Sequence, residues 1–211
     1  LVIVDESHHA RSELSLEMLE NFNPCFVLDL TATPKKESNI ISYVDAVQLK
    51  NEHMVKLPVI VYNRDSQAEV LTDAIDLRNK LEEIANAEYA KTGKYIRPIA
   101  LFQAQPKGKE DATTFEKLRD KLVDAGIPAD QIAIRTADVN ELKNVELMSP
   151  NCPIRYIITV NALKEGWDCP FAYILASLAN KTSQVDVEQI LGRILRLPHT
   201  SQHTQSALNM S

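Results

Sequence analysis

The chain has 211 residues, of which 45% are apolar and 25% charged, and this composition excludes a disordered or fibrous protein. Its 29 acidic and 23 basic residues give a net charge of −6, which excludes a simple cationic coat for nucleic acid but not a local basic groove. No apolar stretch approaches the ~20 residues that a membrane-spanning helix needs. Cys25, Cys152 and Cys169 are far apart and fit neither a disulfide framework nor zinc-ligand spacing, so we expect a cytoplasmic protein with no membrane partner.

Residues 1–56 are predicted to hold two strands and one short helix. Residues 1–4 are a continuous apolar run, typical of a strand buried on both faces of a parallel sheet. A helix is expected over 12–21 and a second buried strand over 25–30. These elements are too few to close a hydrophobic core alone. We therefore expect residues 1–56 to be the rear part of a first domain, in a chain cut from a longer protein.

Residues 57–198 are predicted to form a complete α/β domain. Strands alternate with helices of ten or more residues, which is the pattern of a parallel sheet with helices on both faces. The helix expected over 67–91 ends near Gly93, a residue suited to a helix C-terminus. The polar tail at 199–211 is expected to be loose. Strands are expected at 57–62, 98–103, 131–135, 153–160 and 171–177, and further helices at about 112–125 and 184–196.

Asp5 and Glu6 directly follow the first predicted strand, at the end where open α/β sheets bind ligands. Two adjacent carboxylates there can hold a hydrated magnesium ion and orient a water molecule. The alternative is a strand that ends in solvated charges, and a short motif alone does not separate the two. Thr31 and Thr33 end the next strand, so their hydroxyls are expected at the same edge, as site residues or in an ordinary turn.

The second predicted domain carries two further candidate segments. Gly166 permits close backbone approach, and Asp168 can accept a hydrogen bond from a ribose hydroxyl. Arg193 and Arg196 are three residues apart on a predicted helix, so they project from one face. Their planar guanidinium groups suit phosphate oxygens, and two surface arginines are the alternative.

The order and spacing of these segments resemble the core of superfamily 2 helicases and translocases. Asp-Glu-x-His at 5–8 looks like motif II, and Thr-Ala-Thr at 31–33 looks like motif III. Gln-x-x-Gly-Arg-x-x-Arg at 189–196 matches the motif VI pattern, while 98–103 occupies the place of motif IV. Residues 156–170 look like motif V, and their Glu-Gly-Trp-Asp form is similar to that of the helicase subunit of type III restriction enzymes. The resemblance covers most of the chain.

The resemblance implies two RecA-like domains that bind ATP and Mg²⁺ in a cleft between them, the second being a complete C-terminal helicase domain. It implies that Glu6 orients the attacking water and that Asp5 holds Mg²⁺ through water. Arg193 and Arg196 would stabilise charge on the γ-phosphate as arginine fingers. The implied nucleotide contacts are His8, Gly166, Asp168 and Gln189. The implied coupling and nucleic-acid residues are Thr31, Thr33, Thr159, Asn161, Lys107 and Lys109, with a solvated loop as the alternative for the two lysines.

The implied protein is the DNA-translocating subunit of a type III restriction system, with double-stranded DNA and a modification or specificity subunit as partners. The sequence departs from the family in two places. It contains no Gly-x-x-x-x-Gly-Lys-Ser/Thr loop, and Val160 and Asn161 stand where many relatives carry Thr or Ser followed by Asp. Because the phosphate-binding loop is missing, we expect the chain alone to be inactive as an ATPase.

Other functions stay open at this point. A RecA-like domain without ATPase activity would serve as a binding or scaffold module, and a Gly-Lys-Thr loop upstream would favour the motor instead. A superfamily 2 DNA or RNA helicase unrelated to restriction would share these motifs. A metal-hydrolase cluster of Asp5, His8 and His9 lacks further histidines at ligand spacing.

Overall fold

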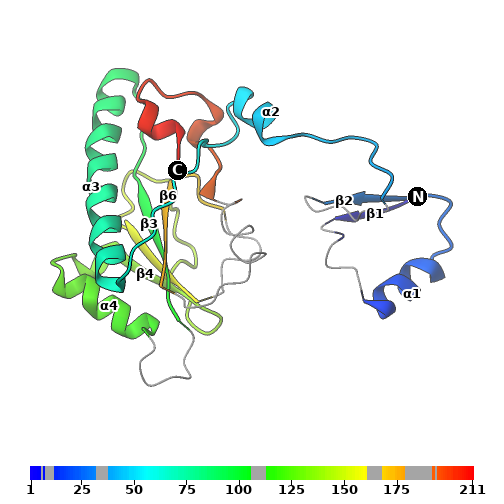
Figure 1. The fold of residues 1–211 in the computed structure, drawn as a ribbon, viewed down its shortest axis with the longest axis horizontal. Coiled ribbons are helices and arrows are strands. Elements are labelled where there is room, and N and C mark those ends of the chain that lie inside the picture. The colour runs from blue at the N-terminus through cyan, green and yellow to red at the C-terminus, as the bar shows by residue number, and fades with distance from the viewer. Residues whose placement is uncertain are drawn as a thin grey trace. The chain divides into compact units, whose positions relative to one another are not determined.

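The chain forms two compact units, Leu1–Val44 and Asp45–Ser211, and each is described here by itself. Figure 1 gives the course of the chain and the labels of its helices and strands. The computed structural model describes residues 1–5, 7, 12–31, 38–105, 113–160, 168–178, 192 and 194–211.

The first unit contains a two-stranded parallel sheet and a connecting helix. Strand β1 (Val2–Asp5) pairs with β2 (Val27–Leu30), and α1 (Glu13–Asn21) lies between them in sequence. Ser12 caps α1 by accepting a hydrogen bond from the Ser15 backbone N–H. The predicted strands and helix are confirmed, but the predictions that the first strand is buried on both faces and that the second is buried are wrong. Ile3, for example, is 58% exposed, because one helix cannot cover both faces of a sheet.

The second unit is built on a four-stranded sheet in which all neighbouring strands are parallel. The order is β4 (Ile132–Arg135), β5 (Tyr156–Thr159), β3 (Ile99–Gln103) and β6 (Ala172–Ser177). Every residue of β3 and β5 is buried, as expected for central strands of a parallel sheet. The predicted parallel α/β class is therefore confirmed, and the arrangement is consistent with a RecA-like fold.

Long helices pack beside this sheet (Figure 1). Helix α3 (Gln67–Thr92) begins with a capping box between Ser66 and Glu69 and ends at Gly93, whose φ of 73° suits a residue without Cβ. Helix α4 (Phe115–Asp124) buries Leu118 and Leu122 against the sheet. The short helix α2 (Ala46–Asn51) has a capping box of its own and was not predicted. Of the helix predicted over 184–196, the structure describes residues 192 and 194–196. Residues 192 and 194 are helical, but the prediction that the helix includes Arg196 is wrong, because Arg196 forms an antiparallel bridge with Val55.

The strand predicted over 57–62 does not form. The segment instead exchanges backbone hydrogen bonds with the end of the chain: Leu57 N–H donates to Asn209 O (3.0 Å) and Ile60 N–H to Ser211 O (2.7 Å). Ser211 N–H in turn donates to Pro58 O (3.2 Å). Pro58 has no N–H group, so this segment cannot complete a ladder with a central strand.

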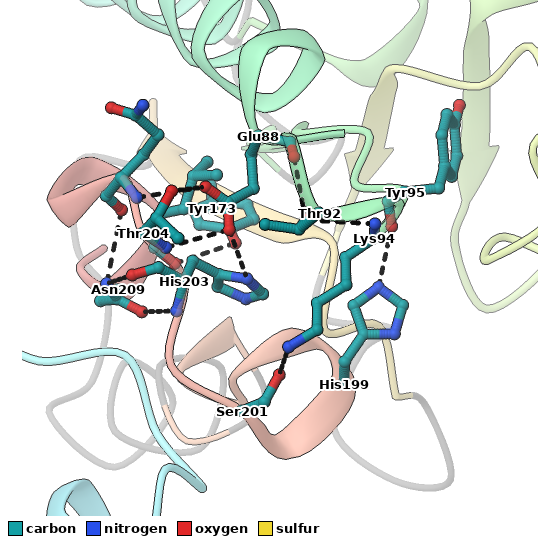
Figure 2. A network of polar contacts seen from close by, with 12 residues as sticks. Glu88, Thr92, Lys94, Tyr95, Tyr173, His199, Ser201, His203, Thr204 and Asn209 are labelled. Atoms are coloured by element: carbon teal, nitrogen blue, oxygen red, sulfur yellow. Dashed lines mark hydrogen bonds and ion pairs between the residues drawn. The ribbon is translucent and has the colours of Figure 1, made fainter. Parts of the chain in front are cut away.

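The prediction of a loose tail over 199–211 is also wrong. Leu208 is fully buried, and its carbonyl accepts a hydrogen bond from the Tyr173 hydroxyl (3.1 Å). Glu88 of α3 accepts hydrogen bonds from the Thr204 N–H (2.9 Å), the Thr204 hydroxyl (2.5 Å) and the Gln205 N–H (3.2 Å). Figure 2 shows these contacts converging on the Glu88 carboxylate. One buried carboxylate thus organises a segment whose polar composition suggested disorder. The short 3₁₀ turns are Ala129–Gln131, Pro198–Thr200 and Ser206–Asn209.

Two histidines lie beside this network in Figure 2. The side chain of His203 is fully buried, with Nδ1 3.8 Å from Glu88 Oε1, and burial lowers its pKa despite the carboxylate. A ring nitrogen of His199 lies 2.9 Å from Tyr95 O, and Lys94 Nζ donates to Ser201 Oγ (2.8 Å). The end of the chain is therefore tied to the C-terminal end of α3 by several independent polar contacts.

Candidate functional site

Asp5, a predicted acidic site residue, lies at the carboxyl edge of the sheet formed by β1 and β2. Asp5 is the last residue of β1 and is exposed, and the parallel register pairs it with Leu30, the last residue of β2. Thr31 follows Leu30 directly and is half-buried, so Asp5 and Thr31 lie at one sheet edge. Ser7 N–H donates to Leu30 O (3.3 Å), which extends the pairing past the strand. Glu6, His8 and Thr33 lie outside the described residues.

A single exposed carboxylate at a strand end fits the way proteins bind Mg²⁺, through one or two carboxylates and several waters. Within the described parts of the chain, no group of three or more His, Cys, Asp and Glu side chains is arranged to hold a metal ion directly.

The carboxyl edge of the large sheet is polar and closely hydrogen-bonded. The register aligns Gln103, the last residue of β3, with Thr159 of β5 and Ser177 of β6. Ser177 Oγ donates to Gln103 Oε1 (3.0 Å), and Ala104 N–H donates to Thr159 O (2.8 Å). Thr159 is 0% exposed, so it can act on a bound nucleic acid only through its neighbours.

The residues that flank 106–112 are held together at the same edge. Gln105 N–H donates to Thr113 O, and Thr113 N–H donates to Gln105 Oε1, both at 3.0 Å. The Gln105 amide also donates to Leu178 O (2.9 Å), and the Thr113 hydroxyl donates to Gln67 Oε1 (2.6 Å). Lys107 and Lys109 fall between these anchors, outside the described residues. The sequence did not single out Gln105 or Thr113, because neither belongs to a recognisable motif.

Asp168 and Arg196 form an ion pair on the surface of the second unit. Arg196 Nη1 lies 2.6 Å from Asp168 Oδ2, and the two side chains are 58% and 48% exposed. Asp168 precedes β6, and Arg196 follows Ile194, which is buried in the core. The structure therefore anchors this part of the motif VI segment in the core while it leaves the Arg196 guanidinium accessible to a ligand.

The remaining motif residues are not part of this geometry. Asn161 and Gly166 of the motif V segment, and Gln189 and Arg193 of the motif VI segment, lie outside the described residues. The pairing of Asp168 with Arg196 was not predicted from the sequence. The two residues are 28 positions apart in the sequence, and no periodic signal predicts such a contact.

Lys56 contacts the backbone next to both members of this pair, at Pro170 and Leu195, and was also missed. It is 0% exposed, and its Nζ donates to Pro170 O (3.2 Å) and to Ala172 O. Its Nζ also sits 3.9 Å from the centre of the Tyr173 ring. Burial lowers its pKa to about 7, although the charge of Cys169 acts in the opposite direction. The only signal in the sequence is a lysine within an apolar run, Met-Val-Lys-Leu-Pro.

Comparison with known proteins gives two similarities. A family described as type III restriction enzyme, res subunit, matches residues 1–36, the stretch that holds Asp5 and Thr31. "Putative helicase 22" of Sulfolobus islandicus filamentous virus (isolate Iceland/Hveragerdi) is 21% identical over 230 aligned residues, which cover 93% of this chain.

The chain spans 40% of the length of that viral relative. The two similarities support the helicase superfamily as the class of this protein, and they do not separate a restriction subunit from other members. In the part of the chain that the structure describes, no helix has the length and apolar character to cross a membrane.

Proposed function

We propose that this chain is part of an ATP-dependent helicase or translocase, and specifically of the DNA-translocating subunit of a type III restriction system in the cytoplasm. Three lines support the proposal: the order of the helicase-like motifs, the family similarity over residues 1–36, and the viral relative named as a helicase. The observation that carries it is the accessible Arg196 guanidinium, held beside Asp168 by a backbone that is itself anchored in the core.

The first unit contributes the acidic side of the proposed reaction. When bound, Mg·ATP supplies the γ-phosphoryl group that is transferred to water. Asp5 holds the magnesium ion through a water molecule, which suits its exposed position at the end of β1. Glu6 orients the attacking water, while His8, Thr31 and Thr33 link the nucleotide to the nucleic-acid site.

The second unit contributes the basic side. Arg196 and Arg193 stabilise the negative charge that develops on the phosphate oxygens, a task suited to the planar guanidinium group. Asp168 accepts a hydrogen bond from a ribose hydroxyl, and Gly166 and Gln189 complete the nucleotide contacts. Because Arg196 pairs with Asp168 at 2.6 Å, binding of nucleotide and rearrangement of this pair are expected to occur together.

Nucleic acid is proposed to bind along the polar carboxyl edge of the large sheet. Lys107 and Lys109 contact phosphates from between the anchors Gln105 and Thr113, and Asn161 contributes from the segment after β5. Affinity that depends on such phosphate contacts falls steeply with salt. Double-stranded DNA is the proposed substrate, with a modification or specificity subunit as the partner that directs binding.

The proposal is tested by ATP hydrolysis in the full-length natural protein, measured with Mg²⁺ and with duplex DNA or RNA. We expect hydrolysis that needs Mg²⁺ and is stimulated by duplex DNA. Arg196→Ala is expected to lower kcat by ~10³-fold, the usual contribution of an arginine finger. Arg64→Ala is the matched control, because Arg64 also forms a surface ion pair, with Asp73 (2.5 Å). Equal activities of the two variants would contradict the assignment of Arg196.

The choice of nucleic acid separates the finer alternatives. Stimulation by RNA rather than by duplex DNA would overturn the restriction subunit and leave another helicase. Binding of nucleic acid with no ATP hydrolysis in the full-length natural protein would favour a binding module. We expect the 211-residue chain alone to hydrolyse no ATP, and magnesium-dependent turnover by it would contradict that expectation.

A further inference from the structure

Lys56 is a fully buried ionisable residue that the proposed reaction does not use. Its side chain reaches two backbone carbonyls at the start of β6, Pro170 O and Ala172 O, and packs against the Tyr173 ring. Placing an ammonium group in the interior costs free energy that close hydrogen bonds only partly return. A methionine or leucine would fill the same space without that cost.

The backbone around Lys56 contacts the second segment of the candidate site. Lys56 N–H donates to Leu195 O (2.5 Å), and Leu197 N–H donates to Met54 O (2.9 Å). Val55 and Arg196 form an antiparallel bridge between these two hydrogen bonds. Arg196 is thus the central residue of a short ladder whose other strand carries Lys56 next to the bridge.

Both members of the exposed ion pair are therefore held by the same residue. The Lys56 side chain fixes Pro170, two residues after Asp168, and its backbone fixes Leu195, one residue before Arg196. The ion pair itself is exposed, and exposed pairs contribute little to holding two segments together. The buried lysine supplies the rigidity that the surface pair lacks.

We propose that Lys56 is a positioning residue, which sets the place of Arg196 relative to Asp168 by clamping the backbones that carry them. The role of this clamp in catalysis rests on the proposed ATPase function, whereas its effect on the local structure does not. A guanidinium that must meet a developing charge loses much of its effect when it is displaced by about 1 Å. Because Lys56 is 0% exposed, we assign it no direct role toward a ligand, and it acts through Asp168 and Arg196.

The structural part is tested by amide hydrogen exchange in the full 211-residue chain, comparing wild type with Lys56→Met. Methionine keeps the length and the apolar stem of lysine but removes its donors. We expect exchange of the Lys56-position and Leu197 amides to accelerate by about tenfold or more, because the variant removes the hydrogen bonds from Lys56 Nζ to Pro170 O and Ala172 O. Amides of β3 and β5 are expected to keep their protection.

Lys94→Met is the matched control. Lys94 also donates its Nζ to a distant residue, Ser201, but it makes no contact with the ladder around Arg196. Its loss is expected to leave the Leu197 amide unchanged. The clamp would be contradicted if exchange of the Leu197 amide were faster than in wild type in both variants, or in neither. If Lys56→Met does not fold, Lys56→Gln is compared with wild type instead, because glutamine keeps an N–H donor. The exchange rate of its Leu197 amide must then lie between the wild-type rate and the rate of an unprotected amide.

The catalytic part is tested in the full-length natural protein. Lys56→Met is expected to lower kcat for ATP hydrolysis by about tenfold while KM for ATP changes less than about twofold, because misplaced Arg196 weakens transition-state stabilisation more than ground-state binding. Lys56→Gln is expected to recover part of kcat. Unchanged kcat together with faster Leu197 exchange would overturn the positioning role. Absence of ATP hydrolysis in wild type would overturn the proposed function, while the exchange experiment still decides the clamp.

Discussion

Strands of similar sequence are buried to different extents in the two units. β1 and β3 are both short, apolar, parallel strands, yet Ile3 of β1 is 58% exposed whereas Ile99 and Leu101 of β3 are fully buried. β3 has a hydrogen-bonded strand on each side, and α3 packs against β3 and β6. Among the described residues of its unit, β1 has one neighbouring strand and one nine-residue helix. A strand's apolar sequence thus specifies its conformation, but burial depends on what the rest of the unit supplies.

The largest expected effect contrasts these strands directly. Leu101→Ala is expected to lower the free energy of unfolding of the second unit by about 2–5 kcal/mol, because it leaves a cavity in a fully packed core. Ile3→Ala is expected to cost less than about 1 kcal/mol, since most of that side chain already contacts water. Urea unfolding of the two variants, each followed by a probe in its own unit, measures both values. Equal costs would show that β1 is buried in the folded protein.

A smaller effect is expected from pH, through groups buried only in the second unit. Burial lowers the pKa of Lys56 to about 7, so between pH 7 and its ordinary value of 10.5 the unfolded lysine holds a proton that the folded one has lost. The free energy of unfolding therefore rises with pH in this window, by at most about 1.4 kcal/mol per pH unit. Burial raises the pKa of Cys169 to about 11, and this opposes the rise above pH 9.

We therefore expect stability to increase from pH 7 to pH 9 and then to level off. Urea unfolding at pH 7, 8 and 9 measures the slope, and Lys56→Met is expected to abolish most of it. Lys94→Met provides the control, because Lys94 lies partly in solvent at the end of α3. A slope that persists in Lys56→Met would assign the pH dependence to other groups.

The parts of the fold that could be predicted are those whose signals are local. Helix α3 carries its own start and stop in Ser66, Glu69 and Gly93, and β3 carries its apolar run. The end of the chain could not be predicted in this way, because Thr204 and Gln205 bind Glu88, more than 110 positions earlier. The contacts of Lys56 could not be predicted for a related reason. Lysine is rarely buried, and its partners Pro170 and Ala172 are equally distant in the sequence.

The contacts of the candidate site also differ in whether local sequence signals predict them. The register of β1 and β2 brings Asp5 and Thr31 to one edge, as parallel pairing of consecutive strands requires. The contact between Asp168 and Arg196, however, depends on how the segment after the sheet folds back to Val55, which no local pattern encodes. Motif spacing therefore located candidate residues, while tertiary structure determined which of the described ones meet.

The smallest expected effect concerns the ion pair itself, and it bears on function. Asp168→Asn is expected to change the free energy of unfolding by less than about 0.5 kcal/mol, because both partners are about half exposed and the gain from pairing is offset by solvation and side-chain entropy. Asp73→Asn, which removes the equally exposed partner of Arg64, is expected to do the same. Urea unfolding of both variants measures the difference. A loss above about 1.5 kcal/mol for Asp168→Asn alone would mean that the pair holds the fold together. Arg196 would then be committed to Asp168, and it would no longer be accessible to a phosphate.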